Sequence, residues 1–169
     1  MINKVTVEEL EKTLKTDNLN SLYLLYGEET FLLENCVKKI KKNFGELING
    51  INYIQIDDKN VDKLISDIET PAFGYPKKLI IVRNSGLFKK ETRGRKKEVN
   101  KEKKSHKTET LQEKISLYII ENIEVIKETL VIIFIEQEIE SNDLQKTIQK
   151  LGIVCDFGRL KPAQISKRL

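Results

Sequence analysis

Short apolar runs alternate along this chain with longer segments in which apolar residues recur every three or four positions. Runs of the first kind are typical of buried strands, and the spacing of the second kind is typical of amphipathic helices. The pattern predicts five strands, at residues 21–26, 52–57, 78–84, 129–136 and 153–158. Because most of these runs are apolar at consecutive positions, we expect strands that are buried on both faces of a parallel sheet.

The segments between these strands carry helix signals. Thr6 and Glu9 have the spacing of a capping box at the start of the first predicted helix, and Thr110 and Glu113 have it at the start of a helix that continues to Ile123. The other helices are predicted at residues 28–44, 60–69 and 141–150. This alternation predicts an α/β fold of three layers, in which a five-stranded, mostly parallel sheet lies between helices.

The size and composition fit one globular domain. A chain of 169 residues with 39% hydrophobic residues can bury a core without disulfides or metals, and we expect residues 1–158 to form it. Cys36 and Cys155 lie far apart in apolar surroundings, which favours reduced thiols over a disulfide or a zinc site. The longest aliphatic run, residues 130–135, is too short to cross a bilayer, so we expect a cytoplasmic protein without membrane contact.

The net charge of +4 is concentrated in one segment. Residues 86–110 contain ten Lys or Arg and four Glu, whereas the remainder of the chain has a net charge of −2. Because this segment has few apolar residues to bury, it predicts a mobile basic insertion at about residues 88–109. A solvated loop is the favoured interpretation, and non-specific contact with DNA is the alternative. The candidate DNA contacts are Lys96, Lys97, Lys103 and Lys104.

Residues 22–40 read as a strand, a glycine turn and a helix, which is where many α/β proteins bind a phosphate. A phosphate-binding loop needs the pattern G-x-x-x-x-G-K-[ST], because its glycines expose backbone N–H groups, its lysine reaches the outer phosphates and its hydroxyl binds magnesium. Counted from Gly27, Leu32 stands at the second glycine, Leu33 at the lysine and Glu34 at the hydroxyl. The sequence therefore predicts a degenerate nucleotide loop that does not bind a nucleotide.

The acidic residues near the strand ends do not complete a catalytic site. Glu28 and Glu29 occupy the place that an anionic phosphate would approach, in what we take as the first turn of the helix. The third strand ends with the residues Arg83, Asn84 and Ser85, which offer no carboxylate to bind magnesium. Asp57 and Asp58 follow the second strand, where such residues are typical of turns and caps. We predict no catalytic residue, no metal and no cofactor.

Residues 70–79, which read TPAFGYPKKL, predict a rigid projection before the third strand. Pro71 and Pro76 stiffen this loop, and Gly74 permits a positive φ. Such a loop would hold Phe73 outward, as an anchor for an apolar pocket on another protein. The alternative is that Phe73 folds back onto the sheet, because a single aromatic side chain more often belongs to a core.

Several stretches together resemble a known family. The segments LYLLYGEETFLLENCVKKI, ETPAFGYPKKLIIVRN and GIVCDFGRLKPAQISKRL are similar to the amino-terminal domain of the delta subunit of the bacterial DNA polymerase III clamp loader. The resemblance implies a degenerate AAA+ module without a nucleotide site. It also implies a non-catalytic function, in which the domain binds the ring-shaped beta sliding clamp and holds one interface open for loading onto primed DNA.

The same resemblance implies which residues contact the clamp. The family's two adjacent apolar contact residues fall on Ala72 and Phe73, while Pro71, Gly74 and Tyr75 shape the tip of the loop. Ala72 departs from the family pattern, which often has a larger aliphatic residue here. The loss of about three carbons of burial corresponds to roughly 2 kcal/mol of contact energy.

Further partners also follow from the resemblance. Residues 159–169 are expected to begin a helical domain, so that the chain is a monomeric fragment. The family binds the other loader subunits, gamma or tau and delta prime, through a carboxy-terminal region, and contacts DNA indirectly. Two other functions stay open at this point: a nucleic-acid-binding module that acts through the basic insertion, and a nucleotide-hydrolysing enzyme, which the failed loop pattern disfavours.

Overall fold

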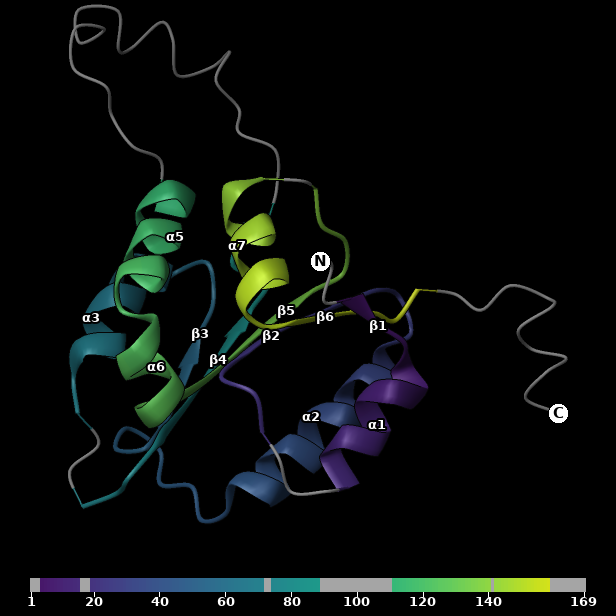
Figure 1. Cartoon of the computed structure of the whole chain (residues 1–169), viewed down its shortest axis with the longest axis horizontal. Coiled ribbons are helices and arrows are strands. Elements are labelled where there is room, and N and C mark those ends of the chain that lie inside the picture. The colour runs from purple at the N-terminus through teal and green to yellow at the C-terminus, as the bar shows by residue number, and fades with distance from the viewer. Residues whose placement is uncertain (1–3, 16–18, 72–73, 89–110, 141, 159–169) are drawn as a thin grey trace, which may run out of the picture.

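A parallel sheet forms the middle layer of the domain, and helices cover both of its faces (Figure 1). The structure is a computed structural model that describes residues 4–15, 19–71, 74–88, 111–140 and 142–158. The described strands are β1 (Lys4–Val5), β2 (Leu22–Tyr26), β3 (Tyr53–Ile56), β4 (Lys78–Arg83), β5 (Leu130–Glu136) and β6 (Ile153–Asp156). The helices are α1 (Val7–Lys15), α2 (Thr30–Phe44), the 3-10 turn η1 (Val61–Lys63), α3 (Leu64–Glu69), α5 (Leu111–Glu121), α6 (Ile123–Thr129) and α7 (Asp143–Leu151).

The strands of this sheet follow the order β1-β6-β2-β5-β4-β3, and each pair of neighbouring strands is parallel. The predicted three-layer α/β fold and its five strands are confirmed. β1 adds a sixth strand at one edge, where Lys4 pairs with Val154. The hydrophobic pattern did not predict it, because two residues are too few to show a period.

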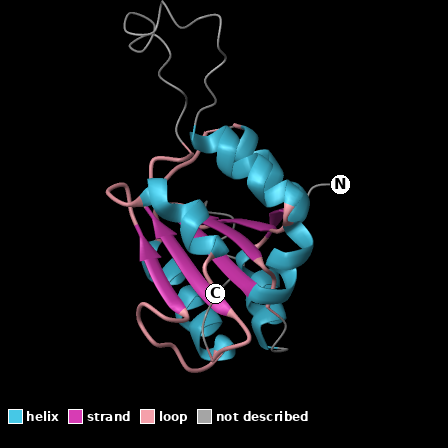
Figure 2. Cartoon of the chain, turned by 90° about the vertical axis from the view of Figure 1, so that its left-hand side faces the viewer, coloured by secondary structure: helices cyan, strands magenta, loops and turns pink. Residues whose placement is uncertain are grey.

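Successive side chains of each strand enter two separate cores. In β2, Leu22 and Leu24 pack in the core that contains residues of α3, α5, α6 and α7, whereas Tyr23 and Leu25 pack in the core beneath α1 and α2. All four side chains are fully buried. Figure 2 shows the sheet between the two groups of helices. Burial on both faces explains why the strands read as continuous apolar runs.

The capping box predicted at the first helix is confirmed. The Thr6 N–H donates to Glu9 Oε1 at 2.9 Å, and the Glu9 N–H donates to Thr6 Oγ1 at 3.1 Å. These two bonds satisfy backbone donors that the first turn of a helix leaves without a partner.

Two helices differ from their predicted extents. The helix expected to continue to Ile123 is divided at Asn122, whose side-chain amide donates to the Tyr118 carbonyl at 2.9 Å. A short amide side chain of this kind competes with regular helix bonds. The helix expected from residue 141 begins at Asp143, because Asn142 caps it by accepting the Gln145 N–H at 2.8 Å. Thr110, the predicted cap of α5, lies outside the described residues.

The boundary of the basic insertion lies after Phe88. This side chain is fully buried, and its ring packs edge-on against Phe134 with centroids 5.4 Å apart. It therefore belongs to the core and not to the insertion. The rest of the predicted insertion and the residues expected to begin a further domain, 159–169, lie outside the described residues. Among the helices that the structure describes, none is long and apolar enough to cross a membrane.

The two buried thiols predict how stability depends on pH. Burial is the largest cause of a raised pKa in both thiols. It raises the pKa of Cys36 from 9.0 to about 11 and that of Cys155 from 9.0 to about 12. Both folded-state values lie above the unfolded value, so their contribution to stability is complete below pH 9 and is lost as the pH rises further. We expect the free energy of unfolding, measured in urea, to fall between pH 9 and 11, and to fall less steeply in Cys155→Val. Equal slopes in the two proteins would contradict this.

Candidate functional site

The two segments that the sequence singled out lie at opposite edges of the sheet. In a parallel sheet all carboxyl ends of the strands meet at one edge. The turn after β2, which corresponds to the degenerate nucleotide loop, lies at this carboxyl edge. Pro71 and residues 74–77 precede β4 and lie at the amino edge. The structure therefore does not bring the two candidate sites together.

The turn at the carboxyl edge is too short and too fully bonded to cradle a phosphate. Only residues 27–29 connect β2 to α2, whereas the eight-position phosphate loop needs several free backbone donors. Here the Gly27 N–H donates to the Glu136 carbonyl at 3.1 Å, and the Glu29 N–H donates to the Phe157 carbonyl at 2.8 Å. These two N–H groups donate to carbonyls at the ends of neighbouring strands and are therefore not available to a ligand.

Gly27 is required by a close approach of two backbones. Its φ is +138°, and a Cβ added at this position would lie 2.1 Å from the carbonyl carbon of Phe157. No side chain fits there, and the turn is consequently packed directly on the residues that follow β6. The glycine that suggested a phosphate loop has a structural explanation.

The three positions that fail the phosphate-loop pattern have other contacts. Leu33 is buried beneath the sheet and Leu32 is half-buried beside it. Glu34 forms a two-point ion pair with Arg83, in which Nη2 and Oε1 are 3.0 Å apart. Arg83 ends β4, where the sequence analysis looked for a magnesium-binding carboxylate. The guanidinium group of Arg83 thus provides the positive charge that pairs with the Glu34 carboxylate.

The two glutamates of the turn differ in detail from their prediction. Helix α2 begins at Thr30, so Glu28 and Glu29 precede its first turn instead of belonging to it. Glu29 is the N-cap residue, but its side chain makes no capping hydrogen bond. Their negative charge still lies just before the positive end of the helix, which is the place that an incoming phosphate would need.

Glu136 is a site residue that the sequence analysis missed. It ends β5 and is buried, and its Oε2 accepts the Ser85 N–H at 3.0 Å and the Ser85 Oγ–H at 3.2 Å. A carboxylate buried at a strand end needs such charge-assisted bonds. The sequence signal is a carboxylate that closes an otherwise apolar run, at residues 129–136.

Gly74, in the amino-edge loop, has the positive φ that the sequence predicted for it. Gly74 has a φ of +86°, and no heavy atom lies within 4 Å of an added Cβ. Pro71 and Gly74 are exposed, while Tyr75 is half-buried. Ala72 and Phe73, the predicted anchors, lie outside the described residues, as do Lys96, Lys97, Lys103 and Lys104, the candidate DNA contacts.

Lys78 closes the base of this loop. It is the first residue of β4 and only 3% exposed, and its Nζ donates to the carbonyls of Asp67 and Thr70 at the end of α3. Burial lowers the pKa of Lys78, while the charge of Asp67 opposes this shift. Since Thr70 precedes the loop and Lys78 follows it, the ammonium group joins its two ends and fixes where it leaves the domain.

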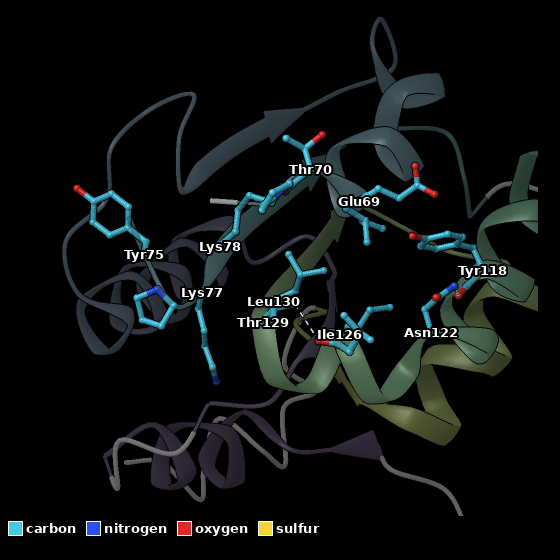
Figure 3. Close-up of a pocket in the computed structure, with 14 residues that line it drawn as sticks. Glu69, Thr70, Tyr75, Lys77, Lys78, Tyr118, Asn122, Ile126, Thr129 and Leu130 are labelled. Atoms are coloured by element: carbon cyan, nitrogen blue, oxygen red, sulfur yellow. Dashed lines mark hydrogen bonds between the residues drawn. The ribbon is translucent and has the colours of Figure 1, made fainter. Parts of the chain in front are cut away.

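A pocket of about 330 Å³ lies beside the loop (Figure 3). It is bounded by the loop, the start of β4 and the surface of α5 and α6. In Figure 3, Tyr118 and Glu69 face each other across one end of it, whereas Tyr75 lies on the loop, away from them. Burial, followed by the charge of Glu69, raises the pKa of Tyr118. The residues of the described chain contain no group of side chains that could hold a metal ion.

Comparison with known proteins assigns this arrangement to a family. The family model described as "DNA polymerase III, delta subunit" matches residues 23–157, which is most of the chain. The chain belongs to this family. The match includes both the closed turn after β2 and the loop before β4, so the similarity expected from the sequence segments is confirmed.

Among curated proteins, this delta-family chain is similar to DNA polymerase III subunit delta of Bacillus subtilis. The two share 30% identity over 92 residues, which cover 50% of this chain and 26% of the relative. The chain therefore spans about a quarter of the length of that protein in the alignment.

Two solved structures have the same fold. The Bacillus subtilis DNA clamp loader delta protein superposes with a TM-score of 0.69 at 22% identity, over 96% of this chain and 45% of that protein. The DNA polymerase III gamma subunit-related protein of Thermotoga maritima superposes with a TM-score of 0.50 at 12% identity, over 94% of this chain and 48% of that protein. At these identities the two comparisons establish the architecture of the delta-family domain.

The closed turn makes a prediction about stability. We expect Gly27→Ala to lower the free energy of unfolding through two effects: backbone strain of about 1–3 kcal/mol and a steric clash of similar size, about 1–3 kcal/mol. Gly45→Ala is the matched control, because Gly45 also has a positive φ, +111°, but has no heavy atom within 4 Å of an added Cβ. Urea unfolding of both variants should show the larger loss for Gly27→Ala, and equal losses would contradict the close approach.

Proposed function

We propose that this delta-family chain is a non-catalytic clamp-binding domain of the DNA polymerase III clamp loader. It binds the beta sliding clamp through Ala72 and Phe73 and holds the ring open for loading onto primed DNA. The observation that carries the proposal is the family match over residues 23–157, which spans the loop before β4. The loader's other subunits, gamma or tau and delta prime, are its further partners, and its contact with DNA is indirect.

The construction of the loop base supports this function. Lys78 holds the carbonyls of Asp67 and Thr70, so the segment between Thr70 and Lys78 starts and ends at fixed positions. A loop whose two ends are fixed loses less conformational entropy on binding than a loop whose ends are free. A larger part of the contact energy of the anchor therefore appears as binding free energy.

The closed carboxyl edge supports a function without chemistry at this domain. The Glu34–Arg83 ion pair and the bonded turn at Gly27 occupy the places that a nucleotide and its magnesium ion would need. Energy for loading then has to come from other subunits. The contribution of this domain is binding, and binding shifts the clamp toward its open form only by the difference between its affinities for the open and closed rings.

Phe73 is the expected main anchor. Replacement of a buried aromatic anchor by alanine typically costs at least about 2 kcal/mol of binding energy, which is roughly a 30-fold loss of affinity. We expect Phe73→Ala to lose the cognate beta clamp in a pulldown and in a titration. The matched control is Phe31→Ala, since Phe31 is also an aromatic residue, is exposed, and follows the turn at the opposite edge of the sheet.

Four results would contradict this prediction or the proposed function. Retention of the clamp by both variants would exclude Phe73 as an anchor, and loss by both would indicate a general defect. Absence of clamp binding by the unaltered chain would remove the proposed function. Saturable binding of fluorescent ATP at micromolar concentration would favour an NTPase and contradict the closed turn.

Ala72 provides a gain-of-function test. A larger aliphatic residue would add about three carbons of burial, worth roughly 2 kcal/mol at about 0.8 kcal/mol for each CH₂ group. We expect Ala72→Leu to bind the clamp up to about 30-fold more tightly, mainly through slower dissociation, as measured by surface plasmon resonance. Ala72→Ser serves as the control of similar size. Unchanged or weaker binding by Ala72→Leu would exclude Ala72 from the contact.

A further inference from the structure

We propose that the pocket beside the loop before β4 binds one apolar side chain of the clamp, so that the domain and the clamp each insert a side chain into the other. This inference rests on the proposed function, since the clamp is the partner. The pocket has a volume of about 330 Å³, whereas ligand pockets span about 300–1,000 Å³. Its size therefore suits a single side chain better than a large cofactor.

Apolar side chains reach the pocket from each of the segments that bound it. They include Ile68 at the end of α3, Pro71 and Pro76 in the loop, and Val125 and Ile126 on α6. Val125 is 58% exposed, although it is a large hydrophobic residue. The pocket thus has an apolar wall that is open to a group from outside the described chain, which is typical of a protein contact.

The polar side chains that line the pocket are bonded within the chain. Thr70, Asn122 and Thr129 each donate a side-chain hydrogen to the backbone carbonyl four residues earlier, at 2.8, 2.9 and 2.8 Å. The Lys78 ammonium group donates to two carbonyls of α3 and the residue after it. A polar ligand such as a nucleotide would find few donors here and would lose its bonds to water. An apolar group loses no such bonds.

The position of the pocket favours the clamp as the source of this group. Pro71 and Tyr75, which flank the predicted clamp contacts in the sequence, both line the pocket, and α6 forms the opposite wall (Figure 3). The loop is therefore a wall of the pocket as well as the proposed binding segment. A partner that sits on the loop is carried over the pocket, so the two contacts form one continuous surface.

The size of a stable interface points the same way. A specific complex buries about 800 Å² on each partner, which is more than the tip of one short loop offers. The contact has to extend onto the neighbouring surface, and the surface that adjoins the loop is the pocket with Val125 at α6. A side chain buried in a pocket is also the kind of contact that carries most of the binding energy of an interface.

Val125→Asp tests the pocket in the 169-residue chain. The substitution places a carboxylate where the apolar side chain would enter, and an unpaired charge is costly to desolvate. We expect about tenfold weaker binding of the cognate beta clamp in a titration. Ile120→Asp is the matched control, because Ile120 is 49% exposed on α5 and does not line the pocket. It should bind as tightly as the unaltered chain, with circular dichroism confirming that both variants are folded.

A second measurement identifies the occupant of the pocket. Benzoylphenylalanine, a photo-cross-linking amino acid, should attach to the clamp when it replaces Val125 and should not attach when it replaces Ile120. Cross-links from position 125 only to the same chain or to a second copy would overturn the proposal in favour of that occupant.

The affinities separate this proposal from the proposed function. If Val125→Asp binds the clamp as tightly as the unaltered chain while Phe73→Ala loses it, the pocket proposal is overturned and the clamp-binding function stands. Equal losses in Val125→Asp and Ile120→Asp would also overturn the pocket proposal. If the unaltered chain does not bind the clamp, both proposals are overturned.

Discussion

The structure depends on the burial of β2, which pairs with β5 on one side and with β6 on the other. Leu22, Tyr23, Leu24 and Leu25 are all fully buried, so the first four residues of the strand have no access to water on either face. Its backbone groups must be satisfied by hydrogen bonds to neighbouring strands, and parallel pairing on both sides provides these bonds. This pairing brings the ends of β2, β5 and β6 together, and the turn after β2 is consequently closed against the residues that follow β6.

Closure of that edge places the proposed clamp-binding loop at the opposite edge of the sheet from the degenerate nucleotide loop. The carboxyl edge, where α/β proteins usually bind ligands, is occupied here by the Gly27–Phe157 approach, by the Glu34–Arg83 ion pair and by the bonds from Ser85 to Glu136. The amino edge carries the loop before β4, which Lys78 closes at its base. Lys78 is only 3% exposed, and a buried ammonium group is costly to desolvate unless it is bonded. The carbonyls at the end of α3, which carry partial negative charge, accept hydrogen bonds from it.

Local patterns predicted most of the fold. The five strands could be recognised because four of them are continuous apolar runs and residues 52–57 alternate between apolar and polar positions. Helix α1 could be recognised because the capping box of Thr6 and Glu9 is a contact between near neighbours. The division of a predicted helix at Asn122 was not predicted, since an asparagine in a helical pattern has no unique outcome. Phe88 was assigned to the insertion because it adjoins a basic run, and its burial depends on Phe134, which lies far along the chain.

Some features of the candidate site could likewise be predicted from the sequence, whereas others depend on the tertiary structure. The sequence by itself determined that the loop after Gly27 lacks the phosphate-binding residues and that residues 70–79 carry two prolines and a glycine around an aromatic residue. Only the tertiary structure decided what replaced the nucleotide chemistry: the partner of Glu34 is Arg83, and the partner of Glu136 is Ser85. It also decided that Lys78 joins the ends of the loop and that the loop and α6 bound the same pocket. The physical reason is that propensities, caps and turns arise between near neighbours, whereas ion pairs and close backbone approaches depend on strand pairing across distant parts of the sequence.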